Sequence, residues 1–180
     1  MKVLLTIVLV LAGIIVLLLI LALFTRKEYA VEREVKIDRS LPNVFDYIRY
    51  LKNQDNFSKW AAMDPAMHKS YRGTDGTVGF VSAWESNQKD VGKGEQEITG
   101  ITEGVRIDYE IRFIKPFEAK ANAYLTTVAV SENQTLVTWG FTSSMKYPTN
   151  LMLLFTNMEK AIGKDFETGL KNLKDVVEKP

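Results

Sequence analysis

The sequence contains no cysteine and only one histidine, His68, which limits the chemistry available to it. Without cysteine, thiol catalysis, disulfide bonds and thiolate metal sites are excluded. No nucleophile and orienting acid accompany His68 in a catalytic pattern, and no group of His, Asp and Glu has the spacing of a metal site. We therefore expect no cofactor and no metal, assign no catalytic residue, and interpret His68 as a surface or hydrogen-bonded side chain.

The chain also lacks an excess of either charge. It carries 23 Lys and Arg against 22 Asp and Glu, interleaved along its length. Proteins that bind nucleic acid usually show a basic stripe, and none is present here. The composition therefore predicts no nucleic-acid partner.

One long apolar run stands at the start of the sequence. Residues 3–24 depart from aliphatic or aromatic character only at Thr6 and Gly13. As a helix rising about 1.5 Å per residue, the run spans roughly 33 Å, enough for a hydrocarbon core about 30 Å thick. A cleaved signal peptide, the alternative, has a shorter apolar stretch and a small-residue cleavage site, which this segment lacks. We interpret residues 1–25 as a single-pass transmembrane signal anchor and residues 26–180 as one domain.

Positive charges flank the predicted membrane helix unevenly. Lys2 precedes the run, whereas Arg26 and Lys27 follow it directly. Basic residues favour the cytoplasmic side of a membrane, so this asymmetry places the domain in the cytoplasm.

Alternation of apolar and polar residues dominates the domain. Residues 29–38 alternate, apart from Arg33, and predict a half-buried strand. Ser40 and Pro42 then suit the N-cap and first turn of a short helix. From residue 67 to residue 145 the alternation returns between glycine-containing turns, which predicts about six antiparallel strands.

The last part of the chain changes period. Apolar residues recur every three or four positions from Asn150 to Glu178, which predicts one long amphipathic helix. Gly163 and Gly169 lie inside it at a cost of about 1 kcal/mol each relative to alanine, so they indicate a close approach to the sheet or a bend. The predicted fold class is α+β, with a curved antiparallel sheet of about seven strands wrapped around this helix, preceded by the transmembrane helix.

This order of elements resembles the SRPBCC superfamily of START-like, helix-grip proteins, and in particular its polyketide cyclase/dehydrase branch. The resemblance covers roughly residues 29–178. Five short segments carry it: 57–60 (FSKW), 73–79 (GTDGTVG), 91–94 (VGKG), 113–117 (FIKPF) and 163–170 (GKDFETGL). It implies a helix-grip fold with an apolar cavity between the sheet and the C-terminal helix.

Large apolar side chains in the inward phase of the predicted elements would line such a cavity. They are Trp60, Trp84, Tyr109, Phe113, Tyr124, Trp139, Phe141, Met158 and Ile162. Tryptophan and tyrosine suit a ligand cavity because they combine apolar area with one polar group. The alternative is that these side chains fill a closed core.

Two polar residues are candidate anchors inside the cavity. Arg33 falls on the apolar face of its strand, where it could bind a carboxylate or phosphate. It could instead lie at a sheet edge and reach solvent. Glu97, with Glu95 in the same phase, could be a buried general acid or base, or both could be solvated on the outer face.

Three functions are consistent with these observations. The first is membrane-anchored binding of a lipid or other small hydrophobic ligand by a monomer, which the anchor favours. The second is a cyclase/dehydrase-type enzyme acting in the same cavity, although no acid–base pair is evident. The third is a protein-interaction module like the chaperone-activating members of the superfamily, which would require a distinctive exposed patch.

Overall fold

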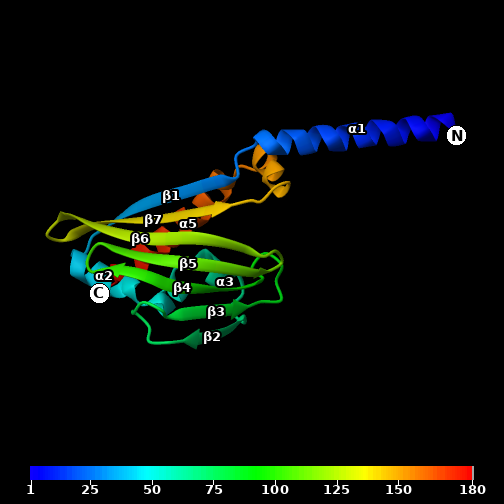
Figure 1. The fold of residues 1–180 in the computed structure, drawn as a ribbon. Helices are drawn as coiled ribbons and strands as arrows, with labels where there is room; N and C mark the ends of the chain where they lie inside the picture. The colour runs from blue at the N-terminus through cyan, green and yellow to red at the C-terminus, as the bar shows by residue number, and fades with distance from the viewer. Residues whose placement is uncertain (180) are drawn as a thin grey trace.

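The computed structural model describes residues 1–179, and it shows a long protruding helix joined to a domain built around one sheet (Figure 1). Helix α1 (Lys2–Phe24) extends away from the domain and is exposed along almost its whole length. By length and composition it can cross a membrane.

The domain contains seven strands and one long helix, with short helical segments between them. The strands are β1 (Glu28–Ile37), β2 (His68–Arg72), β3 (Val81–Glu85), β4 (Lys93–Thr102), β5 (Arg106–Lys115), β6 (Ala119–Ser131) and β7 (Gln134–Ser144). The helical segments are α2 (Leu41–Arg49), η1 (Leu51–Asn56), α3 (Lys59–Met63), η2 (Thr149–Leu151), α4 (Met152–Phe155) and α5 (Met158–Val177).

All neighbouring strands are antiparallel, in the order β1-β7-β6-β5-β4-β3-β2. Strand β1 therefore pairs with the last strand of the chain, from Glu28 opposite Ser144 to Ile37 opposite Thr135. The helices α2 and α3 lie between β1 and β2 in the sequence, which become the two edges of the sheet. The predicted α+β class, with seven strands and a C-terminal helix, is confirmed.

Helix α5 packs on the inner face of the sheet through one apolar stripe. Phe166, Leu170 and Leu173 are buried at intervals of three or four residues. A Cβ atom added to Gly169 would lie 2.8 Å from Cζ3 of Trp139, and one added to Gly163 would lie 2.6 Å from Cζ of Arg33. Both distances are shorter than van der Waals contact, so the two glycines permit the close approach that the sequence indicated.

The core between the sheet and α5 is continuous, with contributions from α2 and η1. Its most buried large side chains are Ile37, Val44, Ile48, Phe57, Phe80, Ile98, Ile107, Tyr109, Leu125, Val137, Leu170 and Leu173. Full burial of such a side chain contributes about 1.5–3 kcal/mol to folding.

The prediction of one unbroken helix from Asn150 to Glu178 is wrong. Thr156 has extended backbone angles (φ −115°, ψ 122°) and separates α4 from α5. The Oδ1 atom of Asn157 accepts a hydrogen bond from the backbone N–H of Lys160 at 2.9 Å. Asn157 is therefore the N-cap of a new helix. This capping interaction starts a second helix although the apolar periodicity of the sequence runs on without a break.

The last turn of α1 packs against the domain, unlike the rest of that helix. The Nδ2 atom of buried Asn150 donates to the backbone oxygens of Ala22 (2.7 Å) and Thr25 (3.0 Å). Ala22, Thr25 and Asn150 are all buried at this junction. The direction in which α1 leaves the domain is therefore set by buried contacts as well as by the chain connection.

Candidate hydrophobic ligand site

Half-buried aromatic side chains lie on the inner face of β3 and β5. Trp84 and Phe113 both pair with Gly94 of the intervening strand β4, and their rings meet edge to face at 6.3 Å. A Cβ atom on Gly94 would lie 2.6 Å from the Trp84 indole, so only glycine leaves room for it. The indole N–H donates to the backbone oxygen of Val91 at 3.2 Å. These contacts hold Trp84 flat along the sheet.

Gly94 was not among the predicted site residues. The available signal was a glycine within a strand, which often marks the close approach of another group. Its neighbours Lys93 and Glu95 are charged and gave β4 only a weak alternating pattern.

The short helix α3 bridges this part of the sheet and α5. Trp60 of α3 packs edge to face against Phe166 of α5, with 5.9 Å between ring centroids. Lys59 forms an ion pair with Asp165, which also lies on α5. Trp60 remains half-buried, so its ring covers the core while keeping contact with solvent.

The other side of α3 is attached to the β3–β4 connection. The hydroxyl of Ser86 donates to Asp64 at 2.5 Å, and the side-chain amide of Gln88 donates to the backbone oxygen of Met63 at 3.1 Å. These two hydrogen bonds fix α3 to the β3–β4 connection.

Deeper residues of the predicted lining belong to a filled core. Trp139 stacks on Phe166 with ring centroids 4.6 Å apart, and Phe57 meets Trp139 edge to face at 5.6 Å. Trp139, Phe141 and Tyr109 are no more than 8% exposed. The predicted lining residues therefore fall into two groups, one buried in this filled core and one still partly exposed to solvent. The second group consists of Trp60, Trp84, Phe113, Met158 and Ile162.

Tyr109 introduces a polar atom into the filled part. Its hydroxyl and the Nε2 atom of Gln54 are both buried and have no hydrogen-bond partner among residues 1–179. Burial raises the pKa of Tyr109 well above its usual range, so its phenol stays protonated.

The inward orientation that we predicted for Tyr124 is wrong. Ala123 and Leu125 point into the core, so Tyr124 lies on the outer face of β6. There its ring lies below the guanidinium of Arg106, whose Cζ is 3.9 Å from the ring centroid. It packs directly over Gly140 of β7.

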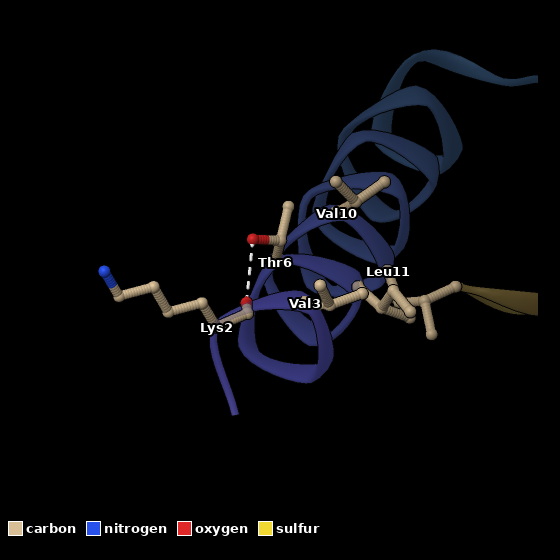
Figure 2. A pocket seen from close by; sticks show the side chains of 6 residues that line it. Lys2, Val3, Thr6, Val10 and Leu11 are labelled. Carbon is tan, nitrogen blue, oxygen red and sulfur yellow. Dashed lines mark hydrogen bonds between the residues drawn. The ribbon is translucent and has the colours of Figure 1, made fainter.

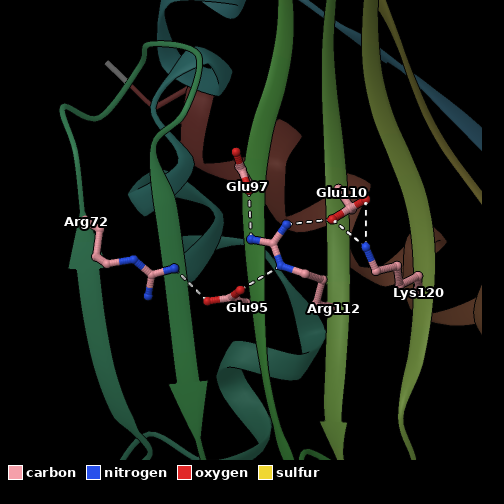
Figure 3. Close-up of polar contacts among 6 residues, drawn as sticks. All are labelled: Arg72, Glu95, Glu97, Glu110, Arg112 and Lys120. Carbon is pink, nitrogen blue, oxygen red and sulfur yellow. Dashed lines mark hydrogen bonds and ion pairs between the residues drawn. The ribbon is translucent and has the colours of Figure 1, made fainter.

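Glu97 also lies on the outer face, so the prediction that it is an anchor inside the cavity is wrong. Figure 3 shows the guanidinium of Arg112 surrounded by three carboxylates, at 2.6 Å from Glu95, 2.8 Å from Glu97 and 2.6 Å from Glu110. Hydrogen bonds from Arg72 and Arg112 lower the pKa of Glu95, and a hydrogen bond from Arg112 lowers that of Glu110. Glu95 and Glu110 are therefore held in the ionised form, which does not suit a general acid.

Arg33 lies on the inner face, opposite Trp139 in the register, but its partners are protein carboxylates. It contacts Glu159 at 2.7 Å and Glu167 at 2.6 Å, both on α5, with Gly163 between them. Strand β1 is an edge of the sheet, which agrees with the second of the two positions considered for Arg33. The charge of Arg33 is thus used to hold the edge strand against the helix.

Two hollows lie elsewhere on the surface. One, of about 400 Å³, follows a single face of α1, where the hydroxyl of Thr6 donates to the backbone oxygen of Lys2 at 3.0 Å (Figure 2). The other is an open groove of about 650 Å³ over β1, β5, β6 and β7, with polar and apolar atoms in similar measure, and is lined in part by Glu110, Lys120 and Thr142. Neither hollow lies between the sheet and α5.

The sheet order, the packing of α5 and the partly open aromatic face define a helix-grip domain of the START-like class. A family model described as polyketide cyclase/dehydrase and lipid transport matches residues 29–178, and the chain belongs to this family of the SRPBCC superfamily. No curated protein sequence matches the chain.

Solved structures share this fold at low sequence identity. Norcoclaurine synthase from Thalictrum flavum, in complex with dopamine and hydroxybenzaldehyde, is 8% identical, with a TM-score of 0.61 over 88% of this chain and 92% of that one. A protein from Thermobifida fusca is 19% identical, with a TM-score of 0.54 over 82% and 92% of the two chains. Protein XoxI from Bacillus cereus is 15% identical, with a TM-score of 0.58 over 82% and 94%. At these identities the likeness establishes the fold alone.

Proposed function

We propose that this protein binds a lipid or other small hydrophobic molecule, as a monomer, at the cytoplasmic surface of a membrane that α1 spans. The observation that carries the proposal is the partial exposure of large apolar side chains on the inner side of the sheet. Trp84, Phe113 and Ile162 keep contact with solvent next to a core in which Trp139 and Phe166 are closely packed. A binding surface with a rigid apolar floor needs little reorganisation to accept an apolar ligand.

The register supports a site near the membrane. The pairings lead from Phe113 across the sheet to the end of α1. Phe113 pairs with Ala119 at the start of β6, and the start of β6 pairs with the end of β7. There Ser144 of β7 pairs with Glu28, the first residue of β1. Trp84 joins the same end of the sheet through Gly94. The exposed aromatic side chains therefore lie toward the end of the sheet from which α1 emerges, where a lipid would have the shortest path.

Polar groups beside the aromatic side chains suit an amphipathic ligand. Ser82 and Gln96 pair with each other on the inner face next to Trp84, and both are half-buried. Tyr71 pairs with Ser82 on the same face. A ligand with an apolar chain and one polar end would find both kinds of contact there.

The comparisons support ligand binding of this general kind. The family description joins polyketide chemistry with lipid transport, and both concern largely apolar molecules. Norcoclaurine synthase has two small aromatic molecules in its complex. The alternative of a cyclase/dehydrase-type enzyme has less support, because Glu97, the candidate general acid or base, lies with Glu95 on the outer face of the sheet.

Energy transfer from tryptophan tests the proposal, because the chain has three tryptophans and all lie at or beside the site. The full-length protein in lipid nanodiscs would be titrated with an anthroyl-labelled stearate as acceptor. We expect a saturable signal with a dissociation constant in the micromolar range, which corresponds to a binding free energy of about 8 kcal/mol.

Two variants that retain every tryptophan give the matched comparison. Phe113→Ala removes an inner-face ring and should weaken binding roughly tenfold, about 1.4 kcal/mol. Tyr124→Ala removes an outer-face ring and should leave binding unchanged. Energy transfer to probe dissolved in the nanodisc lipid gives the same background signal in both variants. Equal, unsaturable transfer in the wild type and both variants would disprove the proposed site.

A further inference from the structure

Helix α4 has an apolar surface that no other part of residues 1–179 covers. Met152, Leu154 and Phe155 are 55%, 57% and 79% exposed, whereas Leu153 between them is buried. Exposed apolar side chains adjoin one another in this short helix, and such a group usually marks an interaction surface.

The position of α4 is fixed beside the end of α1. Asn150, at the start of the same turn, donates hydrogen bonds to Ala22 and Thr25 of α1. Figure 1 shows α4 and η2 in orange directly against the base of the protruding helix. Leu23 and Phe24, in the last turn of α1, are 62% and 85% exposed. Exposed apolar side chains therefore occur both on α4 and on the adjoining last turn of α1.

Basic side chains flank this apolar surface. Arg26 and Lys27 follow α1, and a hydrogen bond of 2.8 Å from the backbone N–H of Met145 to the oxygen of Lys27 brings Lys146 beside them. All three basic residues are exposed and none forms an ion pair within the described chain. Apolar side chains next to unpaired basic ones are typical of segments that lie in the headgroup region of an anionic membrane.

We propose that α4 is a second membrane contact, in which Met152, Leu154 and Phe155 insert into the headgroup region of a leaflet that contains anionic phospholipid. Arg26, Lys27 and Lys146 then lie at the level of the lipid phosphates. The inference rests on the membrane-spanning role of α1 in the proposed function. It adds a fixed orientation, with the aromatic side of the domain close to the bilayer surface.

The geometry favours a bilayer over a protein as the occupant of this surface. Because α1 leaves the domain next to α4, the membrane surface around α1 meets this end of the domain first. A protein partner would have to enter between the domain and the bilayer. Helix α5 begins at Met158, so docking would also bring the first turn of α5 and its half-buried Met158 near lipid.

Single-cysteine labelling tests the proposal cleanly because the chain has no cysteine of its own. Spin labels would be placed at Phe155→Cys, at Val130→Cys near the β6–β7 turn, and at Gly13→Cys within α1. The full chain would be studied in nanodiscs with and without phosphatidylserine, and the collision rates of each label with oxygen and with a water-soluble nickel complex would be measured.

We expect the label at position 155 to resemble the membrane label at position 13, with several-fold higher oxygen-to-nickel accessibility than position 130. The Lys27→Gln, Lys146→Gln double variant should reduce this difference in anionic nanodiscs. If position 13 is immersed while position 155 is as water-accessible as position 130, docking is wrong although anchoring stands. If the label at position 155 is immersed to the same extent in nanodiscs with and without phosphatidylserine, the part of the proposal that gives the basic residues a role in docking is wrong. The Phe113→Ala binding test fails or succeeds independently of these outcomes.

Discussion

Gly169 of α5 lies against the indole ring of Trp139 of β7, and this contact sets the distance between helix and sheet. An added Cβ atom would be 2.8 Å from Cζ3 of Trp139 and 3.4 Å from the backbone oxygen of Phe57. The ring cannot easily move away, because its other contacts include the stacked ring of Phe166 at 4.6 Å.

Gly169→Ala should therefore destabilise the domain although alanine is the better helix former. The helix gains about 1 kcal/mol in propensity, but overpacking of this kind costs about 1–3 kcal/mol and here meets both an aromatic ring and backbone. Thermal unfolding followed by tryptophan emission measures the change. Thr168→Ala, an exposed neighbour on α5, is the control and should be neutral or slightly stabilising. A clear rise in melting temperature for Gly169→Ala would contradict the packing described.

Arg112→Gln should destabilise the sheet by about 1–3 kcal/mol at neutral pH, because it leaves three carboxylates close together without their shared cation. Arg72→Gln removes a guanidinium that contacts only Glu95 and is 61% exposed, so it should cost much less. Denaturant unfolding measures the loss of stability in each variant. Equal losses would show that Arg112 does not hold the cluster together.

The same cluster predicts a pH dependence. The folded-state pKa values of Glu95 and Glu110 lie below their ordinary value of 4.5. Their contribution to stability is therefore complete above that value and is lost as the pH falls through the lowered pKa. The stability gap between wild type and Arg112→Gln should be largest at neutral pH and shrink in acid, as Glu95 and Glu110 become protonated. A gap that stays constant to pH 3 would exclude an electrostatic origin.

Asn150→Ala should loosen the junction between α1 and the domain. It deprives the buried oxygens of Ala22 and Thr25 of their donor, at a cost of about 1–3 kcal/mol. Hydrogen exchange around Thr25 should accelerate, while exchange in the sheet stays slow. Asn157→Ala removes the N-cap of α5 instead, at about 1 kcal/mol, and should leave the junction protected.

Removal of residues 1–25 should give a folded but weakened domain. Asn150 then loses both of its hydrogen-bond acceptors. A fragment that retains the last turn of α1 should melt higher than one that begins at Arg26. Equal melting temperatures would show that the junction contributes nothing to stability.

The fold was largely predictable because most strands alternate clearly. The strict alternation of residues 106–113 matches β5, and the inward phase of Trp139 and Phe141 is correct. In β6 both phases carry apolar residues, so the pattern could not show that small Ala123 faces inward and large Tyr124 outward.

Irregular backbone limited the prediction of the site. The pairing of β4 with β5 shifts between Ile98 and Gly100, so Ile98 and Ile101 both face inward although they are three positions apart. This bulge hides the period that would have placed Glu97 outside. The bridge from α3 to α5 rests on side-chain contacts between distant segments, such as that of Lys59 with Asp165, and these leave no periodic signal.

The pairing of β1 with β7 has a consequence for synthesis of the chain. Strand β1 is synthesised first but pairs with β7, the strand that is synthesised last, so at about 5–20 residues per second β1 stays unpaired for roughly 5–20 s. Its outward phase carries Glu28, Glu32 and Glu34 against the single positive charge of Lys36. On the proposed anchoring by α1, this net negative charge disfavours contact of the unpaired strand with anionic lipid until β7 is synthesised.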